Sequence, residues 1–297
     1  MKKYFLIFLT IVMLALTAIV FWRNFYLTER PKNVGYFLNN QLASTKAAAN
    51  SSFKHEFETD ETIEETGKID NSPNPYWWLN SGGLFYSKDG VGKTIQKELP
   101  QYSKWRLAYA LSSPIDTDNG YHPQNIFRLV SRNKWKNFEQ EVYFKVNKIN
   151  ASESPNRNGS NGVLFFNRYQ NGDNLYYAGI RVDGVAVIKK KINGKYYTLA
   201  KKQFYTNDKP YNRNANPNLI PNEKWLGIKS EVKTNPDKSV SVKLFIDNEK
   251  NGNWVLALEA KDDNEFYSGP PILNDGYAGL RSDFMDVEFD DYGIIEL

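Results

Sequence analysis

The sequence contains no cysteine and only two histidines, His55 and His122, among its 297 residues. Without cysteine there is no disulfide framework, no thiolate zinc site, no cysteine nucleophile and no lipidated N-terminal cysteine. Two imidazoles are too few for a metal site built on histidine, so any metal would need oxygen ligands. These absences exclude several classes of enzyme at the outset.

A strong net charge is also lacking. The chain has 38 Lys and Arg against 34 Asp and Glu, and three of its basic residues, Lys2, Lys3 and Arg23, flank an apolar run. The remaining chain is nearly neutral, which argues against nucleic acid as a partner. Aromatic residues are abundant instead, with 7 Trp, 19 Tyr and 18 Phe. A composition of 41% hydrophobic and 24% charged residues predicts a folded globular protein.

The apolar run covers residues 4–22 and contains no charge. It is long enough to cross a bilayer, which takes about 20 apolar residues. A cleavable signal peptide has a shorter apolar core and a small-residue cleavage site, and the best candidate here, Ala15-Leu16-Thr17, is followed by further apolar residues ending at Trp22. We therefore expect residues 1–29 to be a signal anchor, that is, a transmembrane helix, with cleavage and secretion as the alternative.

The next segment, residues 30–75, is polar and carries a cluster of acidic residues without an apolar period. This composition predicts a flexible stalk. We expect the stalk to hold residues 76–297 outside the cytoplasm, at the cell surface or in the periplasm.

The remaining chain has the signature of antiparallel strands. Asn-Gly and Asp-Gly pairs supply the positive φ that tight strand reversals need. They stand at residues 89–90, 119–120, 161–162, 171–172, 183–184, 193–194, 251–252 and 275–276. Segments with alternating apolar residues are 126–132, 138–146, 163–169, 175–182, 185–191, 225–232, 240–246, 254–259 and 285–292. With roughly twelve strands and no long helical period, we expect an all-β, two-sheet antiparallel jelly-roll sandwich.

Two parts of this region resemble a known superfamily. Residues 276–282 (GYAGLRS) with 287–292 (VEFDDY) resemble the closing strand pair of concanavalin A-like lectin/glucanase domains. Residues 176–181 (YYAGIR), the turn at 183–184 and residues 187–190 (VIKK) are similar to central strands of laminin G-like and 3-keto-disaccharide hydrolase-like members. Members of the superfamily bind or cleave polysaccharides, and some bind calcium or proteins. The resemblance therefore implies a fold and leaves the function to the site.

Three segments repeat an aromatic residue, a glycine and a basic residue at alternating positions, which places the three on one side of a strand. A glycine lets a ligand approach the backbone, and aromatic, basic and acidic side chains are those that contact sugars. We therefore expect a glycan-binding face; the alternative is a second packed face. Its expected ligand-binding residues are Tyr177, Arg181, Trp225, Lys229, Glu231, Tyr277, Arg281 and Asp283, with Gly179, Gly227 and Gly279 between them.

Three weaker constellations remain. Asp286, Glu288 and Asp290 alternate on one strand, as paired carboxylates of a glycoside hydrolase would, or as a polar strand face balanced by Lys and Arg. His122 lies near Gln124, Asn125, Arg128 and Arg132, residue types that polysaccharide lyases of this superfamily use. We expect no cofactor, except that Asp116, Asp118 and Asn119 are candidate ligands for calcium.

These observations predict a membrane-anchored, extracytoplasmic carbohydrate-binding β-sandwich whose partners are a polysaccharide or glycan and, through the N-terminal helix, the membrane. A glycoside hydrolase or polysaccharide lyase of the same fold is the first alternative. A laminin G-like protein-adhesion module is the second.

Overall fold

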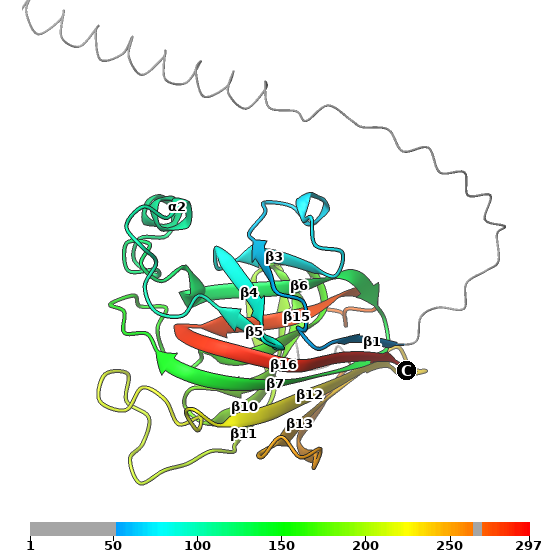
Figure 1. The fold of residues 1–297 in the computed structure, drawn as a ribbon. Helices are drawn as coiled ribbons and strands as arrows, with labels where there is room; N and C mark the ends of the chain where they lie inside the picture. The colour runs from blue at the N-terminus through cyan, green and yellow to red at the C-terminus, as the bar shows by residue number, and fades with distance from the viewer. Residues whose placement is uncertain (1–51, 264–268) are drawn as a thin grey trace, which may run out of the picture. The chain divides into compact units, whose positions relative to one another are not determined.

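The computed structural model describes residues 52–263 and 269–297, which form two antiparallel sheets (Figure 1). The nine-stranded sheet contains β1 (Ser52–His55), β2 (Glu61–Glu64), β4 (Leu84–Lys88), β5 (Val91–Thr94), β7 (Phe138–Ile149), β12 (Trp225–Thr234), β13 (Val240–Asp247), β14 (Val255–Asp262) and β16 (Met285–Glu296). The seven-stranded sheet contains β3 (Trp77–Ser81), β6 (Ile126–Trp135), β8 (Gly162–Asn171), β9 (Asn174–Arg181), β10 (Val185–Ile192), β11 (Lys195–Gln203) and β15 (Gly276–Asp283). The expected all-β class with two antiparallel sheets is confirmed.

The order of strands is β14-β13-β12-β7-β16-β5-β4-β2 in the larger sheet, where β1 also pairs with β16, and β11-β10-β9-β8-β15-β6-β3 in the smaller. Figure 1 shows β16 lying between β7 and β5. One α-helix, α2 (Lys104–Ser112), follows β5 in the described chain, and two short 3-10 helices, η1 (Ile69–Asn71) and η2 (Pro123–Asn125), join strands elsewhere.

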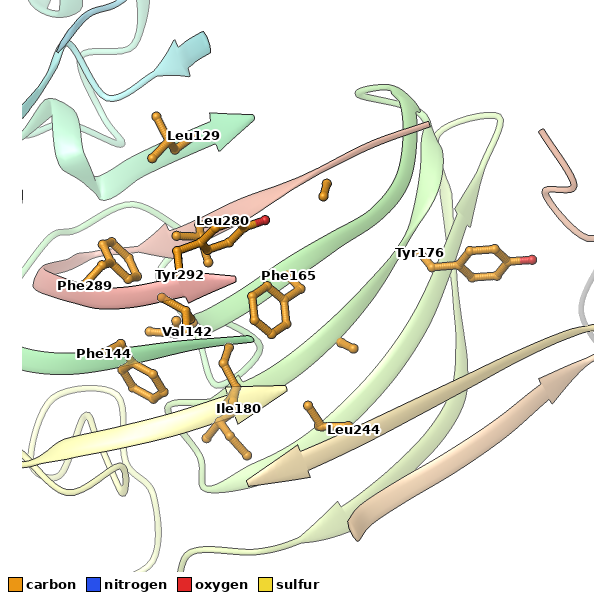
Figure 2. Packing of buried hydrophobic residues seen from close by; sticks show 14 of the residues in the cluster. Leu129, Val142, Phe144, Phe165, Tyr176, Ile180, Leu244, Leu280, Phe289 and Tyr292 are labelled. Carbon is orange, nitrogen blue, oxygen red and sulfur yellow. The ribbon is translucent and has the colours of Figure 1, made fainter. Parts of the chain in front are cut away.

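The main core lies between the two sheets. Figure 2 shows Phe165, Ile180 and Leu280 of the smaller sheet pointing toward Val142, Phe144 and Phe289 of the larger one. All six are at most 1% exposed. Alternation along each strand places these residues on the inner side, because successive side chains of a strand point to opposite faces. Burial of this apolar surface is the main favourable contribution to folding.

A second apolar cluster covers the outer face of the seven-stranded sheet, on the side away from the main core. It consists of Trp78, Val130, Leu164, Phe166, Tyr169, Leu175, Tyr177 and Val187, with Ile69 and Tyr277 packed against it. These residues alternate with residues of the main core along β6, β8, β9 and β10. The smaller sheet is therefore apolar on both sides, and its outer side forms the floor of the site described below.

The prediction of a flexible stalk over residues 30–75 is wrong for residues 52–75. β1 pairs with β16, and β2 pairs with β4, so residues 52–75 already belong to the sandwich. These strands are only four residues long and carry charged side chains, and so they have too few apolar positions to show a period. The expected anchor over residues 1–29 lies outside the described residues. Among the described residues, no helix is long and apolar enough to cross a membrane.

Candidate ligand-binding site

The glycan-binding face expected from the sequence is divided between two sheets. Trp225, Lys229 and Glu231 lie on β12, in the nine-stranded sheet, whereas the tyrosine-containing repeats lie on β9 and β15, in the seven-stranded sheet. All of these residues alternate with core residues and point outward, but from opposite sides of the sandwich. The prediction of one shared face is therefore wrong.

The residues of the β12 repeat, Trp225, Gly227 and Lys229, contact other side chains of the same chain. The Trp225 ring has the ammonium groups of Lys145 and Lys250 at 5.1 and 4.9 Å from its centroid. A Cβ atom on Gly227 would lie 2.7 Å from the Trp254 ring, so the glycine makes room for a tryptophan of the same chain. The Lys229 ammonium lies 4.7 Å from the centroid of that ring.

The charged residues of β12 are also paired. Lys229 Nζ lies 3.1 Å from Glu139 and 2.9 Å from Glu141, and Glu231 lies 3.3 Å from Lys243 Nζ. The pKa of Lys229 is raised because the two carboxylates outweigh the effect of its burial. This face is a network of ion pairs and cation–π contacts.

The seven-stranded sheet carries a pocket of about 460 Å³ on its outer face. We call it the outer pocket. Strands β6, β8, β9, β10, β11 and β15 and the loop before β8 contribute to it, and its lining residues are Asp116, Ile126, Arg128, Asn156, Asn158, Ser160, Asn161, Leu164, Tyr177, Lys189, Tyr196, Arg281, Asp283 and Phe284. Tyr177, Arg281 and Asp283 were expected as site residues from the sequence. The pocket brings them together with polar groups that are distant in the sequence.

Strand register explains this grouping. Arg281 of β15 is the partner of Arg128 on one side and of Leu164 on the other. Tyr177 of β9 is the partner of Lys189 on β10. Partners across neighbouring strands point to the same face, so the basic and aromatic side chains converge.

The aromatic surface that faces solvent is Tyr196, which the sequence analysis missed. Tyr196 is 52% exposed, whereas Tyr177, which lies beneath it, is only 4% exposed. The two ring centroids are 6.0 Å apart, and the Arg281 guanidinium carbon lies 5.3 Å from the Tyr177 ring centroid. Tyr177 thus forms the floor of the outer pocket and Tyr196 its exposed wall. Tyr196 lies on β11, which has no clear alternation of apolar residues, and so no pattern singled it out.

The electrostatics of the two tyrosines differ. Burial raises the pKa of Tyr177 to about 12, so its hydroxyl stays protonated. Burial also raises the pKa of Tyr196, but the positive charges of Arg281 and Lys191 outweigh this effect, and the net shift is downward. The exposed tyrosine therefore stands in a positive potential. Arg281 is oriented by two hydrogen bonds from its Nε to the Asp283 carboxylate, of 3.0 and 2.9 Å.

Arg181 and Tyr277 lie on the same outer face but do not line the outer pocket. Arg181 pairs with Asp183, and its Nε donates to the Gly159 carbonyl at 3.0 Å. Tyr277 packs at the edge of the second apolar cluster, with the Lys134 ammonium 5.4 Å from its ring centroid.

The three acidic residues of β16 have different surroundings. Asp286 is 2% exposed and accepts hydrogen bonds from Lys97 N, Gln124 Nε2 and Asn150 Nδ2, at 2.8, 2.9 and 2.8 Å. Asp290 pairs with a lysine, Lys250.

Glu288 lies 2.7 Å from Lys145 Nζ and 3.5 Å from Lys93 Nζ. Burial raises its pKa, but the two lysines outweigh this, and the pKa is lowered. A general acid needs a raised pKa, and so this carboxylate is unsuited to that role.

The histidine–arginine constellation does not form one site. His122 is 6% exposed, with its Nε2 4.0 Å from a Glu98 oxygen, and burial lowers its pKa. Gln124 and Asn125 belong to the buried network around Asp286. Arg128 lines the outer pocket, whereas Arg132 donates to the carbonyls of Ser72 and Asn74 at 3.1 and 3.0 Å.

The candidate calcium ligands are separated in the same way. Asp116 lines the outer pocket and accepts hydrogen bonds from Ser154 Oγ and from Asn156 Nδ2, the latter at 3.0 Å. Asp118 and Asn119 form a turn with φ angles of 51° and 53°. Residues 52–263 and 269–297 contain no group of three or more His, Asp or Glu side chains placed to hold a metal ion. Calcium binding stays a prediction.

A larger hollow of about 660 Å³ lies at the edge of the nine-stranded sheet. Its lining includes Tyr86, Lys93, Gln96 and Glu98, and none of the ligand-binding residues expected from the sequence. The outer pocket is the better candidate because it lies over the middle of a sheet and combines an exposed ring with guanidinium and amide groups.

No protein-family model matches the chain, and no curated protein does so either. Similar solved structures include the carbohydrate-binding module CBM66 from Bacillus subtilis, with 13% identity, a TM-score of 0.46, and coverage of 74% of this chain and 95% of that one. A prokaryotic β-1,3-1,4-glucanase (lichenase) derived from a mouse hindgut metagenome has 12% identity and a TM-score of 0.44, over 83% of this chain and 99% of that one.

The VIP36 exoplasmic/lumenal domain in its Ca2+/Man-bound form has 8% identity and a TM-score of 0.42, over 80% of this chain and 89% of that one. At such identities and TM-scores these structures assign neither a ligand nor an activity to this chain.

Proposed function

We propose that this protein binds a glycan in the outer pocket. The observation that carries the proposal is the half-exposed Tyr196 ring beside the Arg281–Asp283 pair, in an open pocket lined by three asparagines. A sugar ring offers an apolar face to an aromatic side chain and hydroxyl groups to guanidinium, carboxylate and amide groups. Binding sites of this kind combine apolar contact area with a few well-placed polar groups.

The pocket is also preorganised. Arg281 is held by Asp283, and Tyr177 is fixed beneath Tyr196 by packing. Asn158 is held by hydrogen bonds within its own loop, because Asn161 Oδ1 accepts from Asn158 N at 2.6 Å and Asn158 Oδ1 accepts from Ser160 N at 2.9 Å. Side chains that are already ordered lose less conformational entropy when a ligand binds.

We further propose that the apolar residues 4–22 keep this sandwich at the outer side of a membrane. The length and lack of charge of that segment support the proposal. Cell fractionation tests it: the full chain is expected in the membrane fraction, and a soluble mature form that lacks these residues would contradict it.

The binding proposal is tested with the full chain, purified in detergent and screened on a glycan array. Tyr196→Ala is expected to weaken binding to any hit by about 5- to 150-fold, if stacking on the ring contributes as it does for bases, on the order of 1–3 kcal/mol. Trp225→Ala, on the opposite side of the sandwich, serves as the control and is expected to leave affinity unchanged.

Melting temperatures of both variants show whether each is folded. An array without hits would contradict the proposal. So would a folded Tyr196→Ala variant that binds as well as the parent protein.

A further inference from the structure

The charges that line the outer pocket do not balance. Three cations, Arg128, Lys189 and Arg281, face two carboxylates, Asp116 and Asp283. The Arg281–Asp283 pair is neutral as a unit, since both Asp283 oxygens accept from Arg281 Nε. The remaining charges are therefore one carboxylate and two cations.

The second carboxylate, Asp116, accepts its hydrogen bonds from uncharged donors. It accepts from Ser154 Oγ and from Asn156 Nδ2. Among the described residues Lys189 and Arg128 form no ion pair within 4.0 Å, although Asp283 attracts Lys189 and Glu65 attracts Arg128 electrostatically. Arg128 donates one hydrogen bond, from its NH1 to Ser81 Oγ at 3.1 Å.

Lys189 is held in an unfavourable environment for a cation. Burial lowers its pKa, and repulsion from Arg181 and Arg281 lowers it further. Its ammonium group lies 5.9 Å from the centroid of the exposed Tyr196 ring. An anion beside that ring would relieve the repulsion and give Lys189 an ion-pair partner, because a partly buried cation is more stable when it is paired.

We propose that the glycan in the outer pocket is an acidic oligosaccharide, bearing carboxylate or sulfate groups, and that Lys189 binds one of these groups. This inference rests on the proposed function and names the substrate class of the same site.

Arg128 extends the inference to a second acidic group. It lies on β6, four strands away from Lys189 on β10 in the order β10-β9-β8-β15-β6. At about 4.8 Å between neighbouring strands, the two backbones are roughly 19 Å apart. The two cations would therefore contact different sugar units of one chain that crosses the strands.

The test uses two pairs of polysaccharides; the members of each pair share a sugar backbone and differ in whether it carries acidic groups. Polygalacturonate is compared with its methyl ester, and dextran sulfate with dextran, by affinity electrophoresis of the full chain at low and at physiological salt. We expect binding to at least one acidic member and weaker binding to its neutral counterpart. The two pairs distinguish a carboxylate from a sulfate as the recognised group.

Variants connect this preference to the pocket. Lys189→Gln is expected to weaken binding of the acidic polysaccharide about tenfold or more, as for loss of a hydrogen bond to a charged group. Lys189→Arg keeps the charge and should retain most of the affinity. Lys201→Gln removes the same charge from neighbouring β11 at an exposed position outside the pocket lining, and it should bind like the parent.

Two results would overturn the inference and leave glycan binding intact. One is equal binding of the charged and the uncharged member of both pairs. The other is equal weakening by Lys189→Gln and Lys201→Gln, which would indicate nonspecific attraction to a polyanion. Failure of every acidic and neutral glycan to bind would instead contradict the proposed function itself.

Discussion

Asp286 is a buried carboxylate that forms no ion pair within 4.0 Å in the described part of the chain, and so its stability contribution depends on hydrogen bonds. Its oxygens accept hydrogen bonds from the backbone amide of Lys97 and from the side chains of Gln124 and Asn150. The residue ties the segment after β5, the 3-10 helix η2 and the residue after β7 to the start of β16. Asp286→Ala leaves one N–H group of each of these three donors without an acceptor, while Gln124 Nε2 and Asn150 Nδ2 keep their second bonds, to Lys97 O and Asn125 Oδ1.

The expected cost follows from those three donors. Leaving one buried donor without a partner costs about 1–3 kcal/mol, and so three such donors correspond to about 3–9 kcal/mol. Domains are commonly stable by only about 5–15 kcal/mol. We therefore expect Asp286→Ala either to unfold the protein or to lower its free energy of unfolding by at least about 3 kcal/mol.

Urea denaturation followed by tryptophan fluorescence measures this change, and Glu288→Gln is the matched control on the same strand. Glu288 pairs with Lys145 and Lys93, which are 25% and 30% exposed and can be solvated when the carboxylate is gone. The control should lose no more than about 1 kcal/mol. Coincident urea midpoints for the two variants would refute the assignment of Asp286 as a buried hydrogen-bond hub.

The Glu288→Gln variant also tests the enzyme alternative. If the parent protein depolymerised a polysaccharide and Glu288→Gln did not, a glycoside hydrolase would replace a glycan-binding protein as the function of this sandwich.

Three further predictions concern other parts of the sandwich. Lys190→Met should cost about 3–5 kcal/mol of stability, because it leaves Asp262 without the ammonium group that lies 2.9 Å away in a site that is 0% exposed. Adding Asp262→Leu should restore part of the lost stability. A Lys190→Met variant as stable as the parent protein would disprove the stabilising role of this ion pair. Gly227→Val should displace the Trp254 ring and lower stability by about 1–3 kcal/mol. The tryptophan emission spectrum should change as well, and an unchanged spectrum would contradict the packing of Trp254 against Gly227. Burial lowers the pKa of His122 more than nearby carboxylates raise it, so the unfolded chain takes up the proton first and stability should decrease as the pH falls below 6.5. His122→Gln should reduce this slope, as measured by melting temperatures at about pH 7.5 and about pH 5; an equal slope in both proteins would count against it.

Much of the fold was predictable from the sequence because turns and strands leave local signals. Hairpin turns lie at residues 89–90, 171–172, 183–184, 193–194 and 251–252, where Asn-Gly or Asp-Gly pairs stand, and Asp89 and Asn193 have the positive φ angles of 55° and 50° that such turns need. Each of the nine alternating segments corresponds to a strand. The pairs at 119–120, 161–162 and 275–276 lie outside hairpins, since the first stands in a loop and the glycines of the other two are the first residues of β8 and β15.

The site was less predictable for a physical reason. Alternation separates the inner from the outer side of a strand, but it does not say which of two sheets the strand joins. Trp225 and Tyr177 both point outward, yet the pairing of β12 with β7 and of β9 with β8 places them on opposite sides. Sheet membership depends on pairing between segments far apart in the sequence, and the residues of a single strand do not indicate which segment the strand will pair with.

The position of β15 and β16 has a consequence for the order of synthesis. These two strands leave the ribosome after all the other described strands, yet β15 lies between β8 and β6, and β16 lies between β7 and β5. Until they emerge, each sheet is interrupted, and the strands on either side of the gap present unpaired backbone groups. Both sheets therefore stay incomplete until β15 and β16 have emerged, and a chain released before β15 would carry open edges that favour aggregation.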